Sequence, residues 1–426
     1  MTSARPSVPP PVRWIARTLQ EAGFDTWTVG GAVRDALMGR PGGDWDLSTA
    51  ARPPDVQRLF KRTVPIGIDH GTVGVLARDG TLFEVTTFRK DVETDGRHAV
   101  VEFADRIEDD LARRDFTINA IAWHPQEEEL LDLFNGVGDM EAGLLRTVGT
   151  PADRFAEDHL RILRAFRFAG LFDMTVEQPT WDALCGAVEH LRDLSGERVR
   201  DELLKVLDLD RAPSRALGLY ADSGALAVLY PELEAQRSST AADGWDARLR
   251  VLDALPIGRG HLRLAALLRG IDRESVAHLL GRLRLSNAQI DEAAGRAAAA
   301  ALPLAGDGEV AMRRWLSETG PGRLNALARI ELARSRGGVD LGTAPAPGEV
   351  VAAWRLARRM RRSGAPLTLS ELALDGRDLI RLGLKPGPHF GDVLDGLLDF
   401  VLEDPERNTA PALEKRMAEL ADSPDA

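Results

Sequence analysis

The chain has 426 residues and a formal net charge of −12; 44% of its residues are apolar and 28% are charged. This length predicts two to four domains with ample apolar core, because domains typically run about 100–200 residues. The negative charge disfavours a general nucleic-acid binder, so a polyanionic partner would have to meet local basic patches. No run of about 20 apolar residues is present, which predicts no membrane span.

The single cysteine, Cys185, excludes an intrachain disulfide and a cysteine metal cluster. The Pro-rich start of the chain lacks the apolar segment of a secretory signal. Together these features predict a cytoplasmic protein.

The first predicted elements are a helix at Val12–Ala22 and a strand at Thr26–Val29, and a glycine pair follows directly. Gly30 and Gly31 lack Cβ atoms, so their backbone N–H groups can approach a triphosphate closely. Arg34, in a short helical stretch, is suited to bidentate contact with phosphate oxygens. A plain turn is the alternative interpretation of a glycine pair.

Two acids, Asp44 and Asp46, come next, on either side of Trp45. Residues two apart in an extended strand point to the same face, about 7 Å apart along the chain. Two carboxylates facing one cleft suit Mg²⁺, which takes oxygen ligands, and in two-metal phosphoryl transfer they can bridge ions about 4 Å apart. Taken alone, such a pair is also typical of a solvated strand end.

A helix is predicted at Pro53–Phe60, and strands at Thr72–Ala77 and Leu82–Phe88 flank an Asp-Gly turn that is typical of a hairpin. Glu84 lies in the middle of the second strand. It is either a third acid for metal binding and hydroxyl deprotonation, or a residue on the solvent face of an edge strand.

The segment Arg89–Phe103 is polar, charged and without helical period. It predicts a mobile loop beside the site, because such loops often carry function. A solvated excursion of the chain is the alternative.

The octet RRDFTINA spans Arg113–Ala120 and combines planar donors with acceptors. Arg114 supplies a guanidinium, Asp115 an acceptor for a ribose hydroxyl, and Asn119 a further polar group. A double arginine alone is more often a surface pair.

The segment Phe155–Ala169, FAEDHLRILRAFRFA, is predicted as a helix whose charged residues recur every third position. These residues are Asp158, Arg161, Arg164 and Arg167. A charged surface face is one interpretation, and its pairs would contribute only about 0.2–0.5 kcal/mol each.

A second interpretation comes from base chemistry. Cytosine and adenine each offer an amino donor beside a ring-nitrogen acceptor, and guanine and uracil invert that pair. If Asp158 accepts from the amino group and Arg161 donates to the ring nitrogen, the pair selects C and A without a template. Arg164 and Arg167 would then hold ribose or phosphates.

The combination of G-G-x-V-R-D, D-x-D, RRDFTINA and E-D-x-x-R resembles the signature of the class II tRNA nucleotidyltransferase and bacterial poly(A) polymerase family, within the polymerase β-like superfamily. The resemblance implies template-independent addition of the 3′-terminal CCA of tRNA from CTP and ATP. It also implies Mg²⁺ held by Asp44 and Asp46, and pyrophosphate as the second product. Poly(A) polymerase, and a non-catalytic RNA-binding module on an inactive scaffold, are the alternatives.

The resemblance further implies an α+β nucleotidyltransferase head, a mixed sheet with helices, followed by an all-α C-terminal half. We expect a catalytic head at 1–150, a base-selecting neck at 151–210, a helical body at 211–340 and a tRNA-contacting tail at 349–426. Ser195–Glu202 resembles the family motif that braces the nucleotide-binding helix, and Gly337–Gly348 predicts a linker. The oligomeric state stays open.

Overall fold

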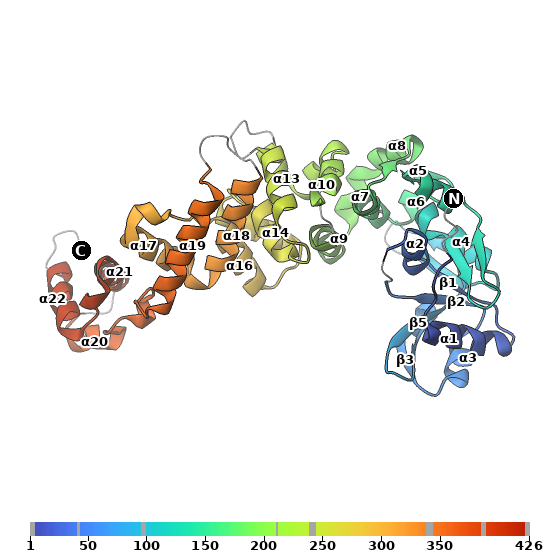
Figure 1. The fold of residues 1–426 in the computed structure, drawn as a ribbon, viewed down its shortest axis with the longest axis horizontal. Helices are drawn as coiled ribbons and strands as arrows, with labels where there is room; N and C mark the ends of the chain where they lie inside the picture. The colour runs from blue at the N-terminus through green and yellow to red at the C-terminus, as the bar shows by residue number, and fades with distance from the viewer. Residues whose placement is uncertain are drawn as a thin grey trace. The chain divides into compact units, whose positions relative to one another are not determined.

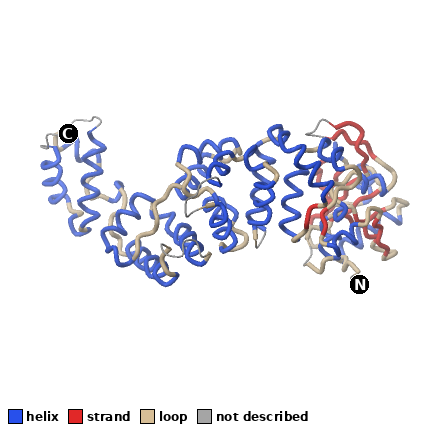
Figure 2. Tube along the Cα trace, turned by 90° about the horizontal axis from the view of Figure 1, so that it is seen from above, coloured by secondary structure: helices blue, strands red, loops and turns tan. Residues whose placement is uncertain are grey.

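The computed structural model describes residues 5–40, 43–94, 99–209, 212–237, 244–337, 344–384 and 389–421. The chain forms two compact units, one of Met1–Val206 with Arg215–Pro231 and one of Leu207–Ser214 with Glu232–Ala426. In the described part of the chain, no strand follows Val176. The expected α+β head followed by an all-α half is therefore confirmed, as Figure 2 shows by the gathering of strands in the N-terminal part.

The first unit is built on a seven-stranded mixed sheet with the order β3-β4-β5-β2-β1-β8-β9. Its strands are β1 (Thr26–Val29), β2 (Asp46–Thr49), β3 (Thr63–Gly67), β4 (Thr72–Leu76), β5 (Leu82–Thr87), β8 (Ile121–His124) and β9 (Glu129–Asp132). β2 and β5 run parallel, and the other neighbours run antiparallel. A separate parallel pair joins β10 (Leu144–Leu145) to β11 (Thr175–Val176).

A core cluster joins this sheet to the helices α1 (Pro10–Glu21), α2 (Gly31–Leu37) and α3 (Pro53–Leu59), which Figure 1 labels beside the strands. In α1, Val12, Ile15 and Leu19 recur at helical spacing and are buried against sheet residues such as Val85. Each fully buried side chain of this size contributes about 1.5–3 kcal/mol. Because neighbours along a strand face opposite sides, the residues next to the buried ones point away from this core.

The segment Arg89–Phe103 differs from the expected loop. β6 (Arg89–Thr94) and β7 (Ala99–Phe103) pair antiparallel in a sheet of their own, and residues 95–98 lie outside the described residues. The sequence carries β-prone residues on both sides of Asp95-Gly96, a turn dipeptide. The high charge of the segment favoured the prediction of a loop over that of two paired strands.

The predicted single helix over Phe155–Ala169 is also wrong. The structure has α6 (Pro151–Glu157) and α7 (Leu160–Phe172), and Asp158 between them has an extended backbone, φ −153° and ψ 105°. Oδ1 of Asp158 accepts a hydrogen bond from the backbone N–H of Leu160 at 3.1 Å. Such local side-chain bonds compete with helical backbone bonds, which explains the break.

The other helices of the first unit are α4 (Ile107–Ala112), α5 (Gly136–Ala142), α8 (Gln178–Ala187), α9 (Gly196–Leu209), α10 (Pro213–Asp222) and α11 (Ala225–Leu229), of which α9 and α10 cross the unit boundary; α12 (Pro231–Arg237) belongs to the second unit except for its first residue. The second unit contains α13 (Trp245–Ala254), α14 (Gly260–Leu267), α15 (Arg273–Arg282), α16 (Asn287–Ala297), α17 (Gly308–Thr319), α18 (Leu324–Arg336), α19 (Pro347–Arg362), α20 (Gly376–Arg381), α21 (His389–Glu403) and α22 (Ala410–Ala421).

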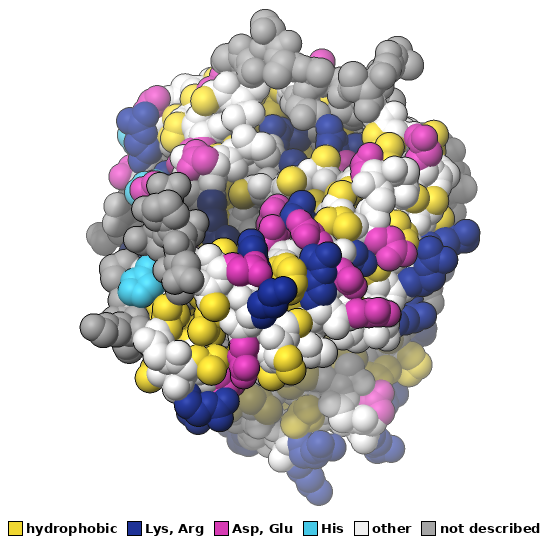
Figure 3. All heavy atoms as spheres, turned by 90° about the vertical axis from the view of Figure 1, so that its left-hand side faces the viewer, with side chains coloured by type: hydrophobic (Ala, Val, Ile, Leu, Met, Phe, Trp, Pro, Cys, Tyr) yellow, Lys and Arg dark blue, Asp and Glu magenta, His cyan; other side chains and the backbone are white. Residues whose placement is uncertain are grey.

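Two apolar clusters hold the second unit together, one around Trp315 and Leu327 and one around Leu379 and Leu397. On the face in Figure 3, basic and acidic side chains are interspersed rather than segregated. No helix in the described residues is long and apolar enough to cross a membrane. Residues 338–343 of the predicted linker lie outside the described residues.

Candidate active site

The acidic residues of the D-x-D motif meet a third acid on the sheet. Asp46 is the first residue of β2, and the parallel register pairs Leu47 with Val85 in β5. Asp46 therefore lies beside Glu84, and both point to the face opposite the buried valine and leucine side chains. Asp44 precedes the strand. β5 lies between β4 and β2, so the alternative that places Glu84 on an edge strand is wrong.

The pKa of Asp46 is affected by its burial and by the neighbouring acids. Burial, with repulsion from Glu84 and Asp44, raises the pKa of Asp46 to about 6, although Arg114 opposes the rise. Like charges at partly buried positions disfavour ionisation. A cation among them would relieve that repulsion, and a donor set made only of carboxylate oxygens suits Mg²⁺.

The carboxylates do not close into a full protein cage. Among the described residues, the one group of three His, Cys, Asp or Glu side chains with ligand atoms within 4.8 Å of one another is His159, His190 and Asp193. Magnesium typically takes one or two carboxylates and completes its shell with water and substrate phosphates. The arrangement of the acids fits that mode.

The glycine pair lies at the same end of the strands as the acids. Val29, the last residue of β1, pairs with Asp46, the first residue of β2. Gly30 has φ +74°, a left-handed conformation that favours glycine. A Cβ atom at Gly30 would lie 3.0 Å from Nη1 of Arg114. The turn thus requires glycine for its backbone and for its close approach to an arginine of the site.

Arg34 projects from α2 into protein contacts. It donates to Oδ1 of Asp35 at 2.9 and 2.8 Å and to Oδ1 of Asn119 at 2.5 Å. Its guanidinium lies over the Phe172 ring, 4.4 Å from the centroid. Burial lowers the pKa of Arg34, and Asp35 opposes that effect. The predicted triphosphate clamp is therefore already braced by protein partners.

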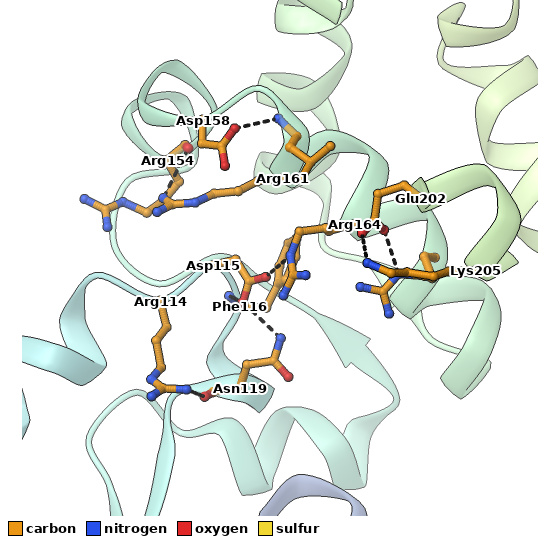
Figure 4. A network of polar contacts seen from close by, with 12 residues as sticks. Arg114, Asp115, Phe116, Asn119, Arg154, Asp158, Arg161, Arg164, Glu202 and Lys205 are labelled. Atoms are coloured by element: carbon orange, nitrogen blue, oxygen red, sulfur yellow. Dashed lines mark hydrogen bonds and ion pairs between the residues drawn. The ribbon is translucent and has the colours of Figure 1, made fainter. Parts of the chain in front are cut away.

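Figure 4 shows how Asp115, which follows α4, is joined to Arg164 of α7. Its carboxylate accepts from Asn119 Nδ2 at 2.9 Å, from the backbone N–H of Phe116 at 2.9 Å and from Arg164 Nε at 2.7 Å. Burial alone would raise its pKa, but Arg164 and these hydrogen bonds outweigh burial and lower the pKa of Asp115 to about 2. Asp115 is thus a fully ionised anchor.

Arg114 connects the acids to this network. Its Nη2 donates to Asp110 at 3.0 Å and its Nη1 to the backbone oxygen of Asn119 at 3.3 Å. The positive charge of Arg114 limits the rise in the pKa of Asp46. It also helps to lower the pKa of Asp110, against the effect of burial.

The two predicted base-reading residues are held by separate partners. Asp158 accepts from Nη2 of Arg198 in α9 at 2.9 and 2.8 Å. Arg161 donates from Nη1 to Oε2 of Glu157 at 2.6 Å and from Nη2 to the backbone oxygen of Arg113 at 3.1 Å. The two side chains are therefore held by different partners.

The remaining predicted arginines diverge. Arg164 faces Asp115; burial lowers the pKa of Arg164, but Asp115, followed by Glu202 and Asp158, outweighs burial and raises it. Arg167 instead donates to Oε2 of Glu202 at 2.7 Å, and Lys205 donates to the other oxygen at 3.0 Å. Arg164 thus lies in the network around Asp115, whereas Arg167 braces α7 against α9.

Sequence reasoning missed three acids that fix these arginines. Asp110, Glu157 and Glu202 are buried or half-buried and pair with Arg114, Arg161 and Arg167 respectively. For the first two, a signal was present, because each lies four residues before its arginine on or beside a helix. Glu202 is 35 residues from Arg167, so the spacing of these residues in the sequence does not indicate that they pair.

Comparison with known proteins gives a consistent result along the chain. A model of the poly A polymerase head domain matches residues 26–146, and a model described as the probable RNA and SrmB-binding site of polymerase A matches residues 173–237. A CCA-adding enzyme of Limosilactobacillus fermentum is 34% identical over 96% of both chains. One of Geobacillus kaustophilus is 36% identical over 92% of this chain and 93% of its own.

The fold agrees with a solved structure as well. The crystal structure of the Bacillus stearothermophilus CCA-adding enzyme in complex with CTP is 32% identical, with a TM-score of 0.72 over 97% of this chain and 98% of that one.

Proposed function

The chain belongs to the family of CCA-adding enzymes, and we propose that it adds or repairs the 3′-terminal CCA of tRNA with CTP and ATP, without a nucleic-acid template. The observation that carries this proposal is the position of Asp46 beside Glu84 on one sheet face, with Asp44 and Arg114 close enough to change its pKa. Poly(A) synthesis is less favoured, because the relatives that align over more than 90% of the chain are named as CCA-adding enzymes.

In the proposed reaction, the terminal ribose 3′ hydroxyl attacks the α-phosphate of the incoming nucleotide in line, and pyrophosphate leaves. Asp44 and Asp46 would hold Mg²⁺, which supplies a lower pKa for the attacking hydroxyl and charge neutralisation for the leaving group. Glu84, exposed beside Asp46, is suited to accept the hydroxyl proton.

The other residues of the head position the nucleotide. The N–H groups at Gly30 and Gly31 face the triphosphate, and Arg34 supplies a donor held in place by Asp35 and Asn119. Arg114 and Asp115 orient the sugar. Because Asp115 is ionised and fixed by three donors, it offers a ribose hydroxyl a rigid acceptor.

The neck selects the base. Asp158 accepts from the amino group of cytosine or adenine, and Arg161 donates to the adjacent ring nitrogen. In this scheme Asp158 stays held by Arg198 and accepts from the base with its remaining lone pairs, while Glu157 holds Arg161 in place. Arg164, which faces Asp115, supports the ribose or phosphates, and Arg167, predicted for the same role, acts through its pair with Glu202 by holding α7 against α9.

The proposed domain functions follow the order along the chain. Residues 1–150 form the catalytic head, 151–210 the neck, 211–340 the body and 349–426 a tail that contacts tRNA. We place the enzyme in the cytoplasm with its tRNA substrate.

The test is an incorporation assay. Purified protein with Mg²⁺ receives tRNA that lacks its last three nucleotides, together with CTP alone, ATP alone, or both. The proposal predicts two C residues with CTP, and a complete CCA end with both. Long A tracts on any RNA would establish the polymerase instead, and no incorporation would indicate a binding module.

A further inference from the structure

A cluster of metal-ligating side chains lies outside the candidate active site. In the described residues, His159, His190 and Asp193 form a group whose ligand atoms all lie within 4.8 Å of one another. His159 sits at the break between α6 and α7, whereas His190 and Asp193 belong to the 3₁₀ helix η3 (Val188–Asp193). The cluster thus joins the break in the neck to a segment that follows α8.

His159 has the chemistry of a prepared ligand. Its ring is buried, and Nδ1 lies 2.8 Å from the backbone oxygen of Phe155. A carbonyl oxygen only accepts, so Nδ1 carries the proton and Nε2 keeps its lone pair. Metal-binding histidines typically donate their other ring N–H to a carbonyl or carboxylate in this way.

The side chains of His190 and Asp193 are exposed to solvent and can change their rotamers. The His190 ring stacks on His159 with centroids 4.9 Å apart and planes 13° apart, and Oδ2 of Asp193 lies 3.6 Å from His190 Nδ1. Two stacked rings do not direct their lone pairs at one ion. The side chain of His190 is 60% exposed, however, so rotation into another rotamer can release its ring from the stack.

We propose that His159, His190 and Asp193 form a binding site for a zinc-like divalent transition cation, with water completing its coordination. Two imidazoles and one carboxylate match zinc, whereas magnesium prefers oxygen ligands alone. Tetrahedral ligands about 2.0–2.1 Å from zinc lie about 3.3 Å from one another, so the group must close by about an ångström or more. Rotation of His190 provides that movement.

The proposed site lies beside the two segments that hold the Asp158–Arg198 pair. His159 follows Asp158 directly, and η3 leads into α9, which carries Arg198. A bound ion ties the two segments that hold the Asp158–Arg198 pair.

The test measures zinc directly and does not depend on the proposed function. The full chain is dialysed to equilibrium at about pH 7.5 against Zn²⁺, with excess Mg²⁺ to occupy oxygen-ligand sites. Metal per chain is then counted for wild type, His190→Ala, Asp193→Ala and the matched control His261→Ala, an exposed histidine of the second unit.

We expect wild type and His261→Ala to bind one equivalent more than either His190→Ala or Asp193→Ala, because each of these two variants lacks one of the three proposed ligands. Zinc should also raise the Tm of wild type and not that of His190→Ala, because binding to the folded state alone stabilises it. Equal zinc content in wild type and His190→Ala would overturn the proposal. His190 is largely exposed, so its replacement leaves the core unchanged, and circular dichroism verifies the fold.

Discussion

Asp158 is held by Arg198: a single guanidinium nitrogen, Nη2, lies 2.9 Å from Oδ1 and 2.8 Å from Oδ2 of the carboxylate. The two residues come from the α6–α7 break and from α9, 40 positions apart in the chain. Both side chains are about one-quarter exposed, so solvent and a ligand can reach the pair. The carboxylate proposed to read the base is thus aimed by a residue of the neighbouring helix.

Replacing Arg198 by alanine should therefore weaken nucleotide use without unfolding the chain. Without its partner, Asp158 samples other rotamers, and loss of such positioning lowers kcat/KM by about 10²-fold. We expect the loss for both CTP and ATP in steady-state assays. Arg192→Ala is the matched control, because Arg192 forms an exposed pair with Glu189 at 3.0 Å. Equal kcat/KM values for Arg198→Ala and wild type would refute the positioning role.

The stability of the chain should depend on the ionisation of Asp46. The folded state binds this proton more tightly than the ordinary pKa of 3.8 allows, since the pKa is raised to about 6. Ionisation therefore lowers the free energy of unfolding as the pH rises from about 4 to about 6, and the loss is complete above about pH 7. The difference corresponds to at most about 3 kcal/mol.

Asp46→Asn should accordingly raise the Tm at pH 8 in the absence of divalent metal, and this gain should disappear near pH 4. Added Mg²⁺ should stabilise wild type and not the variant, and incorporation should fall by about 10³-fold or more in the variant. Differential scanning calorimetry at the two pH values provides the measurement. A variant that is less stable than wild type at pH 8 would contradict the repulsion described here.

Alanine substitutions at Gly30 and Gly39 separate the effect of backbone strain from that of a steric contact with Arg114. Gly30 and Gly39 both have positive φ, +74° and +66°, but only at Gly30 does a Cβ meet a neighbour, Arg114. Each alanine substitution should destabilise the chain by about 1–3 kcal/mol, because a positive φ strains a residue that has a Cβ atom. Activity per folded molecule should fall only for Gly30→Ala. Chemical denaturation with parallel assays measures both, and a similar loss of activity in Gly39→Ala would remove the specific role of the contact.

Local patterns predicted the elements of the head that depend on short spacing. The strand at Thr26–Val29 has the predicted bounds, and α1 (Pro10–Glu21) differs by two residues at its start and one at its end. The break at Asp158 was missed because the helical period of the flanking residues continues across it. A side-chain hydrogen bond to the Leu160 N–H decides that backbone, and periodicity does not report it.

The candidate site was predictable in its residue types and less so in its pairings. The clustering of Asp46 with Glu84 depends on the register between β2 and β5, which lie more than 30 residues apart in sequence. The partners of Arg34 and Arg167 likewise arise from tertiary packing: Asn119 lies 85 residues from Arg34, and Glu202 lies 35 residues from Arg167. Sequence spacing alone contains no information about such contacts.

Protein side chains take the place of a template in the proposed reaction, and the substitution Asp158→Asn tests this role. The amide has the shape of the carboxylate but both donates and accepts, so it can pair with the uracil oxygen that a carboxylate repels. Exchanging Asp158 with Arg161 is a poorer test, because the exchange would also break the bonds of Arg161 to Glu157 and to the Arg113 backbone.

The measurement is the ratio of kcat/KM for CTP to that for UTP, on tRNA lacking its last three nucleotides. A site built for specific hydrogen bonds rejects the wrong partner by about 10⁴–10⁵-fold. We expect such a ratio for wild type and a ratio at least about 10²-fold smaller for Asp158→Asn. An unchanged ratio would show that the base is selected elsewhere.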